Sequence, residues 1–460
     1  MELGVGGSNP PCCTKKMTKD KKNKPSKELP LGFVDRQEKE LLVRDLIISN
    51  IKEVMIKYGF QYLETPSFEY TDSIGKFLPD KDRPDEGVFS FKDENKWLSL
   101  RYDLTAPLAR YVAKNYLEIP KPFKRYQLGT VWRNEKPGPG RFREFLQFDA
   151  DYVGTKSLQA DAELCVMISE ILEKCGLSKS DYIIKISSRK ITEELFKKIN
   201  LNDNQQKLTA LRALDKIDRL GWKGVKELLG EGRKDKSGDF TKGANLSSQS
   251  IDSIEKELKK KSPESEDLID ILKIFKDYNF KNYEFDPSII RGLEYYTGAI
   301  FEVNLKFDVK NNKGQAIQFG SIGGGGRYDN LVSNFGNYDA PATGISIGLD
   351  RLVYAIMQKK EFEVKQSKPV VICVFDKKSM KEYINLLKLL RESGISTEIY
   401  PEESKLKKQM EYANKIKSPA VILYGENEIK LKKLTLRNLG SGEEKFIEID
   451  KLINEIKKII

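Results

Sequence analysis

The chain has 460 residues, of which 39% are hydrophobic and 32% charged, enough material for about three globular domains. It contains no histidine, which excludes Ser-His-Asp triads, Cys-His pairs and histidine-ligated metal sites. The 80 Lys and Arg residues against 69 Asp and Glu residues give a net charge of +11, which favours a polyanionic partner.

Neither the cysteines nor the apolar runs indicate a disulfide scaffold, a zinc site or a membrane span. The five cysteines, at positions 12, 13, 165, 175 and 373, have no C-x-x-C spacing. No apolar run approaches the ~18 residues that cross a bilayer, and the first residues lack the apolar stretch of a secretory signal. We therefore expect a soluble cytoplasmic protein with no membrane partner.

The first half of the chain reads as a tail followed by alternating helices and strands. Residues 1–28 are Lys-rich with almost nothing apolar, which predicts a disordered basic tail. Apolar periodicity predicts helices over 34–60 and 105–116, and strands over 61–69, 88–92 and 97–102. Two further strands, 123–133 and 142–153, flank a loop rich in Pro and Gly and predict a long antiparallel hairpin.

The second half changes character twice. Residues 190–284 are Lys- and Glu-rich with helical periodicity and Gly- or Ser-rich breaks, which predicts an inserted helical subdomain. Strand-like sequence returns over 285–350 and is followed by a helix over 349–359. Residues 368–460 alternate short strands with helices, which predicts a separate α/β domain on a small, mostly parallel sheet.

The predicted hairpin carries the first cluster of chemically useful side chains. Period-2 alternation puts Arg143 on one face with Phe145, Gln147, Asp149 and Asp151. A guanidinium, an aromatic ring, an amide and carboxylates on one face suit a nucleotide, because Arg forks bind phosphate and a ring stacks on a base. The alternative is a solvent-facing hairpin held by cross-strand ion pairs.

The same residues carry a family resemblance. V-W-R-N-E at 131–135 with R-F-R-E-F-L-Q-F-D-A-D at 141–151 resembles motif 2 of the class II aminoacyl-tRNA synthetases, in the form typical of the histidyl subgroup. R-G-L-E-Y-Y-T-G at 291–298 and G-G-G-R-Y-D at 324–329 resemble two signatures of that subgroup, and G-I-S-I-G-L-D-R at 344–351 resembles motif 3. Pro66 fits the motif 1 proline, which in the family lies at a dimer interface.

The resemblance runs in order from about residue 30 to 460 and implies a fold. We expect an α+β catalytic domain on a mixed, largely antiparallel sheet, a helical insertion and a C-terminal α/β anticodon-binding domain. The catalytic domain is expected over 29–190 and 285–365, the insertion over 191–284 and the anticodon-binding domain over 368–460. Homodimers are implied as well.

The resemblance also implies a reaction, the ATP-dependent ligation of L-histidine to its tRNA through a histidyl-adenylate. Arg133 and Arg291 match the catalytic residues that hold the α-phosphate. The matching contacts to ATP are Arg133, Glu135, Arg141, Phe145, Gly348 and Arg351. ATP is expected as a substrate that brings Mg²⁺ with it, and no metal site built by the protein is expected.

Histidine recognition is assigned by the same resemblance. The implied contacts are Asp103, Thr105, Arg133, Gln147, Asp151, Arg291, Tyr295 and Tyr296. A carboxylate opposite a phenol suits imidazole, because each group can hydrogen-bond one of the two distinct ring nitrogens. For Tyr295 and Tyr296 the alternative is one core ring and one surface ring. We interpret Gly323–Gly326 as tight backbone packing beside a ligand rather than a phosphate loop, since no P-loop lysine follows.

Two other functions compete with this interpretation. One is a regulatory subunit of an ATP phosphoribosyltransferase, a catalytically silent relative that shares the fold and can lack the tRNA-binding end. The other is a module that binds RNA or senses uncharged tRNA, for which the catalytic arginines Arg133 and Arg291 would be unnecessary.

Overall fold

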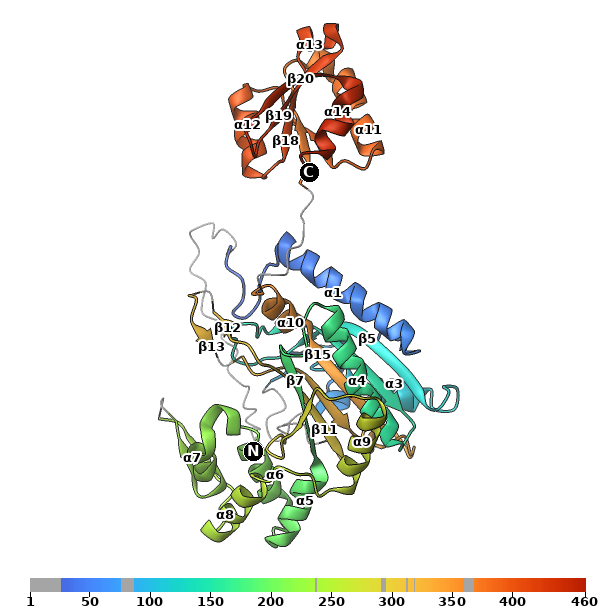
Figure 1. The fold of residues 1–460 in the computed structure, drawn as a ribbon. Helices are drawn as coiled ribbons and strands as arrows, with labels where there is room; N and C mark the ends of the chain where they lie inside the picture. The colour runs from blue at the N-terminus through green and yellow to red at the C-terminus, as the bar shows by residue number, and fades with distance from the viewer. Residues whose placement is uncertain are drawn as a thin grey trace, which may run out of the picture. The chain divides into compact units, whose positions relative to one another are not determined.

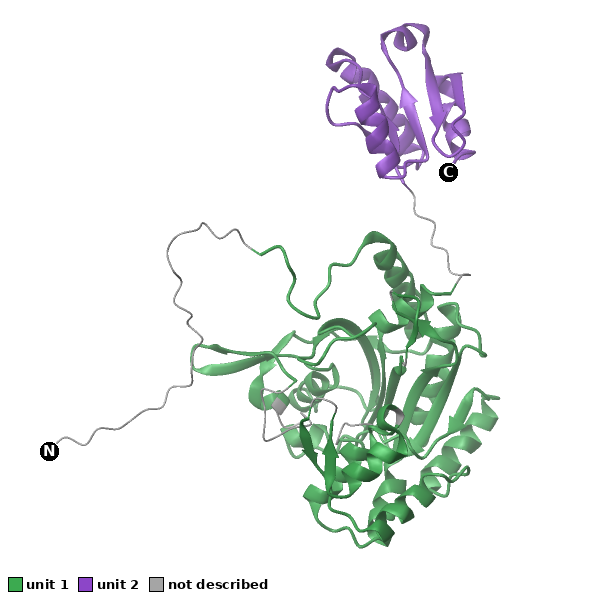
Figure 2. Cartoon of the chain, turned by 90° about the vertical axis from the view of Figure 1, so that its left-hand side faces the viewer, with its two compact units in different colours: residues 1–362 green, residues 363–460 purple. Residues whose placement is uncertain are grey.

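The computed structural model describes residues 26–75, 87–235, 238–290, 295–311, 313–317, 319–359 and 368–460. The chain divides into two compact units, residues 1–362 and 363–460 (Figure 2). The predicted basic tail lies outside the described residues as far as residue 25. Within the described ranges, no helix has the length and apolar character needed to cross a membrane.

Unit 1 is built on an eight-stranded sheet in the order β1-β5-β6-β15-β14-β11-β7-β10. Its strands are β1 Gln61–Tyr62, β5 Phe123–Trp132, β6 Glu144–Val153, β7 Tyr182–Ser188, β10 Tyr283–Phe285, β11 Ala299–Leu305, β14 Ser321–Arg327 and β15 Ala342–Gly348. All neighbours are antiparallel except the two edge pairs, β1-β5 and β10-β7. The expected mixed, largely antiparallel sheet is confirmed, and β5-β6 is the predicted hairpin.

Helices cover one face of this sheet (Figure 1). The other face carries residues that line a cavity. The covering helices are α1 Glu38–Lys57, α4 Leu158–Lys174, α9 Glu266–Asp277 and α10 Leu349–Ile356. Along β6, Phe148 and Ala150 are fully buried and alternate with the polar Gln147, Asp149 and Asp151. Since successive side chains point to opposite faces, the apolar set packs under the helices and the polar set faces the cavity.

A smaller sheet and helix α3 Thr105–Lys114 flank the cavity side. The smaller sheet has the order β2-β4-β3, with β2 Phe68–Tyr70, β3 Ser90–Asp93 and β4 Lys96–Leu100, and α2 Thr71–Gly75 follows β2. The single strand predicted over 61–69 is wrong, because β1 and β2 belong to different sheets. Pro66 lies between them, and proline lacks the N–H that a continuous strand would donate.

The Lys- and Glu-rich segment is helical, as expected. It contains α5 Arg189–Lys198, α6 Asn204–Leu214, α7 Ile217–Leu229, α8 Ser248–Glu257 and a hairpin of β8 Gly232–Lys234 and β9 Phe240–Lys242. These helices share a hydrophobic cluster that includes Leu214, Val225, Leu229 and Ile254. The chain then returns to the main sheet, since α9 packs against α4 and β10 pairs with β7. The shorter elements of unit 1 are β12 Val309–Lys310, β13 Ala316–Ile317 and the 3₁₀ turn η1 Val332–Phe335.

Unit 2 is a five-stranded α/β domain with strand order β17-β16-β18-β19-β20. Its elements are β16 Val370–Ile372, η2 Lys377–Ser379, α11 Met380–Glu392, β17 Thr397–Ile399, α12 Leu406–Lys415, β18 Ala420–Leu423, α13 Glu426–Leu431, β19 Lys433–Asn438, β20 Glu444–Glu448 and α14 Ile449–Lys457. Two pairs are parallel and two antiparallel, so the prediction of a mostly parallel sheet is wrong. The links after β18 and β19 are too short for a crossover and reverse the chain instead.

Candidate active site

A single cavity on the open face of the large sheet brings the predicted site residues together. Those that line it are Asp103, Thr105, Arg133, Glu135, Arg141, Phe145, Gln147, Asp151, Tyr295, Tyr296, Gly348 and Arg351. Arg291 lies outside the described residues. Pro66 is exposed on the β1-β2 link and does not line the cavity.

One end of the cavity is cationic. The Arg133 guanidinium lies 4.5 Å from the ring centroid of Tyr102 and 5.1 Å from that of Phe145. Arg351 lies 4.6 Å from the ring centroid of Phe319, and burial, helped by the charge of Arg141, lowers its pKa to about 10. Arg351 is charged at neutral pH. Neither guanidinium forms an ion pair within the described part of the chain. They are therefore available to an anion.

The position of Arg351 is fixed by the start of α10. The preceding residue, Asp350, is buried and accepts hydrogen bonds from Arg36 Nε at 3.1 Å and Arg36 Nη2 at 2.9 Å. Its Oδ2 also accepts from the backbone N–H of Leu146 on β6, at 2.8 Å. A carboxylate in the first turn suits the helix dipole and ties α10 to the central hairpin.

Glu135 contributes a carboxylate to the cationic end. It accepts a hydrogen bond from the Tyr102 hydroxyl at 2.8 Å and pairs with Arg141. Burial alone raises the pKa of Glu135, but Arg133 and Arg141 outweigh it and hold the pKa below its usual value. Glu135 is thus an ionised acceptor placed among cations, where it can hold an N–H or hydroxyl group.

The opposite end of the cavity is acidic. Asp103 caps α3 by accepting from the backbone N–H groups of Thr105 at 3.2 Å and Ala106 at 3.0 Å. Gln147 Nε2 donates to Asp149 at 2.7 Å, and the Thr105 hydroxyl lies 3.5 Å from the other oxygen of Asp149. Carboxylates, a hydroxyl and an amide gathered in this way suit an ammonium group.

The pKa of Asp149 is shifted far from its usual value. Asp149 is buried, and desolvation together with the charge of Asp151 raises its pKa to about 7, against the opposing charge of Arg125 and the bond from Gln147. Between about pH 4 and pH 7 the native state therefore holds a proton that the unfolded chain has lost. The free energy of unfolding falls as the pH rises through this window and stays low above it.

We expect Asp149→Asn to remove this pH-dependent loss of stability, because asparagine does not ionise. At about pH 8 the free energy of unfolding should exceed that of the wild type by roughly 2 kcal/mol, and the gain should shrink toward about pH 5. Urea unfolding followed by tryptophan fluorescence measures it, because Trp97, Trp132 and Trp222 all lie in unit 1. Asp45→Asn, an exposed acid of α1, is the control. A gain that does not depend on pH would contradict the explanation.

Asp151 is held by two residues that the sequence analysis did not assign to the site. Tyr328, which follows β14, donates its hydroxyl proton to Asp151 Oδ1, and Arg125 Nη2 lies 3.1 Å from Oδ2. Gly344 on β15 makes room for this carboxylate, since a Cβ there would lie 1.9 Å from Oδ1. Tyr328 could have been found from its place in G-G-G-R-Y-D, and Arg125 from the alternation that puts it on the face of Arg133.

Both tyrosines of the adjacent pair reach the cavity, so neither is a surface ring of the kind considered above. The rings of Tyr295 and Tyr296 are 4.9 Å apart, and the Tyr295 ring meets that of Tyr328 edge to face at 5.8 Å. Burial raises the pKa of Tyr295 well above its usual value. The phenol of Tyr295 is therefore a neutral group that can donate or accept a hydrogen bond.

The glycine run forms the floor of the cavity. Gly323, Gly324 and Gly325 line it from β14, between β11 and β15. A Cβ on Gly325 would lie 1.9 Å from the carbonyl oxygen of Gly344. This agrees with the expected tight backbone packing and leaves the floor free of side chains.

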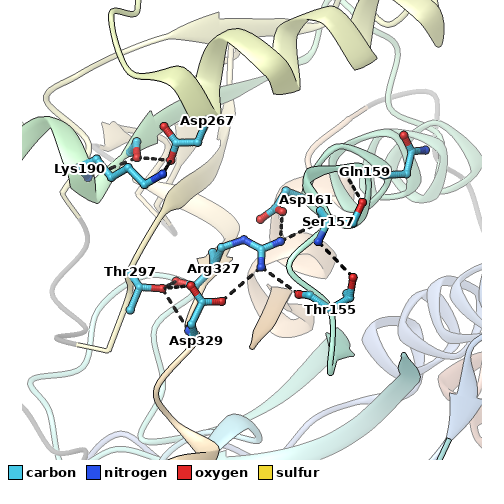
Figure 3. Close-up of polar contacts among 10 residues, drawn as sticks. Thr155, Ser157, Gln159, Asp161, Lys190, Asp267, Thr297, Arg327 and Asp329 are labelled. Atoms are coloured by element: carbon cyan, nitrogen blue, oxygen red, sulfur yellow. Dashed lines mark hydrogen bonds and ion pairs between the residues drawn. The ribbon is translucent and has the colours of Figure 1, made fainter. Parts of the chain in front are cut away.

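Arg327 fixes the segments that carry the tyrosines (Figure 3). Its buried guanidinium pairs with Asp161 of α4 and with Asp329 at 3.3 Å. It also donates to the carbonyl oxygens of Thr155 and Ser157, each at 3.0 Å. Thr297, which follows the tyrosine pair, donates to Asp329 at 2.8 Å. The start of α4, the end of β14 and the tyrosine turn are thus joined at one charged centre.

The fold and the cavity together define a class of protein. A largely antiparallel sheet presents unpaired arginines at one end of a cavity and carboxylates at the other, on the strands that carry motif 2 and motif 3. This is the catalytic domain of a class II aminoacyl-tRNA synthetase.

Comparison with known proteins gives the family. Residues 32–352 match the model of the histidyl-tRNA synthetase family, and residues 369–459 match that of an anticodon binding domain. The histidine–tRNA ligase of Bartonella quintana (strain Toulouse) is 46% identical over 451 residues, which span 92% of this chain and 91% of the relative. That of Brucella ovis is 44% identical over 460 residues, spanning 94% and 92%. The chain belongs to the histidyl-tRNA synthetase family.

Solved structures agree on the fold. The crystal structure of histidyl-tRNA synthetase from Nostoc sp. PCC 7120 matches with a TM-score of 0.70 at 26% identity, over 95% of this chain and 100% of that one. A structure from Bacillus halodurans C, described as an ATP phosphoribosyltransferase regulatory subunit/histidyl-tRNA synthetase, matches with a TM-score of 0.63 at 22% identity. At that identity the second match concerns the fold alone.

Proposed function

We propose that this chain joins L-histidine to ATP as histidyl-adenylate, releases pyrophosphate, and transfers the histidyl group to its tRNA. Ligation of histidine to tRNA is the activity for which its relatives are named. The observation that carries the proposal is the cavity itself, which is lined both by buried carboxylates and by arginines that form no ion pair among the described residues.

In the first step a histidine carboxylate oxygen attacks the α-phosphorus of ATP, and the bond to pyrophosphate breaks. Negative charge builds on the phosphoryl oxygens, so fixed cations stabilise the transition state. Arg133 and Arg291 hold the α-phosphate, and Arg351 holds the γ-phosphate end. Phe145 stacks beneath adenine, and the remaining ATP contacts are Glu135, Arg141 and Gly348. Mg²⁺ enters with ATP as part of the substrate.

Histidine binds at the acidic end of the cavity. Asp103, Thr105 and Gln147 contact the α-amino group and the amino-acid backbone, and Arg133 and Arg291 contact its carboxylate. Asp151 accepts one imidazole N–H, while Tyr295 and Tyr296 complete the side-chain pocket. An apolar analogue would leave these buried groups unpaired, which costs more binding free energy than a lost apolar contact.

In the second step a ribose hydroxyl of tRNA attacks the carbonyl carbon of histidyl-adenylate, the bond to the phosphate breaks, and AMP leaves. Because the chain has no histidine, the base that assists this transfer is not an enzyme imidazole. A phosphate oxygen of the adenylate takes the hydroxyl proton, with Gln147 orienting the groups. The C-terminal domain, residues 368–460, binds the anticodon, and the insertion, residues 191–284, clamps the acceptor arm.

Histidine-dependent exchange of labelled pyrophosphate into ATP tests this proposal on the full chain. We expect exchange with histidine and none with other amino acids. Absence of exchange from a folded chain that binds ATP would favour the regulatory-subunit alternative. Arg133 and Arg351, which form no ion pair among the described residues, support the enzyme instead.

A second copy of the chain is the further partner that we propose. The outward face of the smaller sheet exposes Phe68, Tyr70 and Phe91, with exposed fractions of 49%, 50% and 43%. The rings of Phe68 and Phe91 meet edge to face at 5.4 Å, so the patch is continuous across the sheet. Pro66 lies exposed beside it. An aromatic patch of this kind is typical of a protein interface.

We expect Phe68→Glu to convert a dimer into a monomer, because a charge buried at the centre of an apolar interface weakens association by about 100-fold or more. Sedimentation velocity at micromolar concentration measures the state. Phe240→Glu is the matched control, since Phe240 is an exposed aromatic on the β8-β9 hairpin of the insertion. A Phe68→Glu chain that remains dimeric would place the interface elsewhere.

A further inference from the structure

Arg125 is the largest of the fully buried side chains and does not line the cavity. It lies on β5, directly opposite Asp151 on β6. Its Nη2 donates to the carbonyl oxygen of Leu104 at 2.9 Å and lies 3.1 Å from Asp151 Oδ2. Its Nε and Nη1 have no hydrogen-bond partner among the described residues. Burying a guanidinium whose N–H donors are not all hydrogen-bonded costs free energy of folding. We therefore expect the charge of Arg125 to stabilise an opposite charge nearby.

Asp151, the acid beside Arg125, lies among other buried carboxylates. Two more buried carboxylates face it, Asp149 on the same strand and Asp103 at the start of α3. Burial raises the pKa of Asp151, and Asp103 raises it further, whereas Arg125 and the hydroxyl of Tyr328 lower it. Arg125 is the cation that acts on Asp151 among the described residues. Without it, the pKa of Asp151 would rise further.

The protonation state of Asp151 determines which hydrogen bonds it can form with the imidazole ring of histidine. An ionised carboxylate only accepts hydrogen bonds, and each of its oxygens can accept two, so Asp151 has capacity left beside Tyr328. A protonated Asp151 has an O–H donor in place of one of these acceptor positions, and this donor would oppose an N–H of the histidine ring. The ionised form therefore is the one that accepts an imidazole N–H without competition.

We propose that Arg125 is a positioning residue for histidine specificity: from behind the pocket it keeps Asp151 ionised and aimed, so that Asp151 accepts an imidazole N–H of the substrate. The proposal rests on the function proposed above, in which Asp151 contacts the imidazole ring. It adds a residue that never touches the substrate, together with a reason why a charge is buried at that point of β5.

Arg125→Met tests the proposal through the pH dependence of the histidine KM in pyrophosphate exchange. At about pH 7 we expect the histidine KM to rise roughly 10- to 100-fold, because Asp151 becomes protonated. Toward about pH 9 Asp151 ionises again, so the KM should return toward that of the wild type, whose own KM stays level. The KM for ATP should change by less than about 2-fold, since Arg125 lies away from the cationic end.

Two more variants separate charge from packing. Arg125→Lys keeps a cation at the site, and its histidine KM should stay within a few-fold of the wild type with no recovery at higher pH. Tyr328→Phe keeps the ring but removes the other group that stabilises ionised Asp151. Its histidine KM should therefore also rise at about pH 7 and return toward that of the wild type at about pH 9, by a smaller factor than in Arg125→Met. This variant decides the question if Arg125→Met does not fold.

If Arg125→Met raises the histidine KM equally at about pH 7 and about pH 9, the proposal is wrong and Arg125 has a packing role. If Arg125→Met does not fold, the same result in Tyr328→Phe overturns the proposal. The proposed function fails in a different way, because the wild-type chain itself would then show no histidine-dependent exchange.

Discussion

Replacement of Arg133 by glutamine is expected to slow histidine-dependent pyrophosphate exchange by roughly 100- to 1,000-fold, the usual loss for one preorganised transition-state contact. Arg133 is held between the rings of Tyr102 and Phe145, and its Nε donates to the Tyr102 carbonyl oxygen at 3.3 Å. Its position is therefore set before substrate arrives. Glutamine keeps a polar group there but lacks the charge. Single-turnover measurement of adenylate formation gives the effect on the chemical step.

Arg143→Gln is the matched control for this variant. Arg143 lies across the hairpin from Arg133, and its carbonyl oxygen accepts the Arg133 backbone N–H at 2.8 Å. Its guanidinium stacks on Phe89 at 4.9 Å and does not line the cavity. We expect exchange within about 3-fold of the wild type. Equal losses in the two variants would mean that the hairpin needs its arginines for folding rather than for the reaction.

Much of the fold was open to prediction because it follows from local patterns. The alternation along 142–153 and the Pro- and Gly-containing loop before it specified the central hairpin, which the structure contains as β5-β6. The helical spacing over 34–60 specified α1. Order along the chain is local information. The order of strands within a sheet is not local, and it was not predicted; the family resemblance implied only a mixed, largely antiparallel sheet.

The errors have the same origin. Nothing in the run from 61 to 69 reveals that its two ends pair with different sheets, because that depends on β4 and β5. In unit 2 the strand pattern was found, but direction depends on the length of each link, and the two short links after β18 and β19 reverse the chain. A pattern of apolar residues specifies a strand without specifying its neighbour.

The cavity shows the same limit at the scale of side chains. Motif residues such as Gln147 and Asp151 could be named from sequence, because the resemblance to motif 2 assigns them. Arg125 could not be paired with Asp151, because their contact depends on the register of the hairpin across the 25 residues between them. Tyr328 reaches Asp151 from β14, which β15 separates from β6. Contacts between strands therefore had to come from the structure.

Gly344 is the point where three strands must approach closely for this pocket to exist. It pairs with Asp151 on β6 and with Gly326 on β14. A Cβ at Gly344 would lie 1.9 Å from Asp151 Oδ1 and 2.7 Å from its carboxyl carbon, which is closer than atoms approach in proteins. The carboxylate would have to turn away, and it would lose the Tyr328 hydroxyl and the ion pair with Arg125.

We therefore expect Gly344→Ala to raise the histidine KM by about 100-fold or more, because the imidazole contact and the two groups that aim it are lost together. The KM for ATP should stay within a few-fold, since the arginines lie at the other end of the cavity. Unfolding should cost about 1–3 kcal/mol less, as for other overpacked sites. Gly138→Ala is the control, since a Cβ there has open space within 4 Å. A Gly344→Ala chain with an unchanged histidine KM would mean that Asp151 does not bind the substrate.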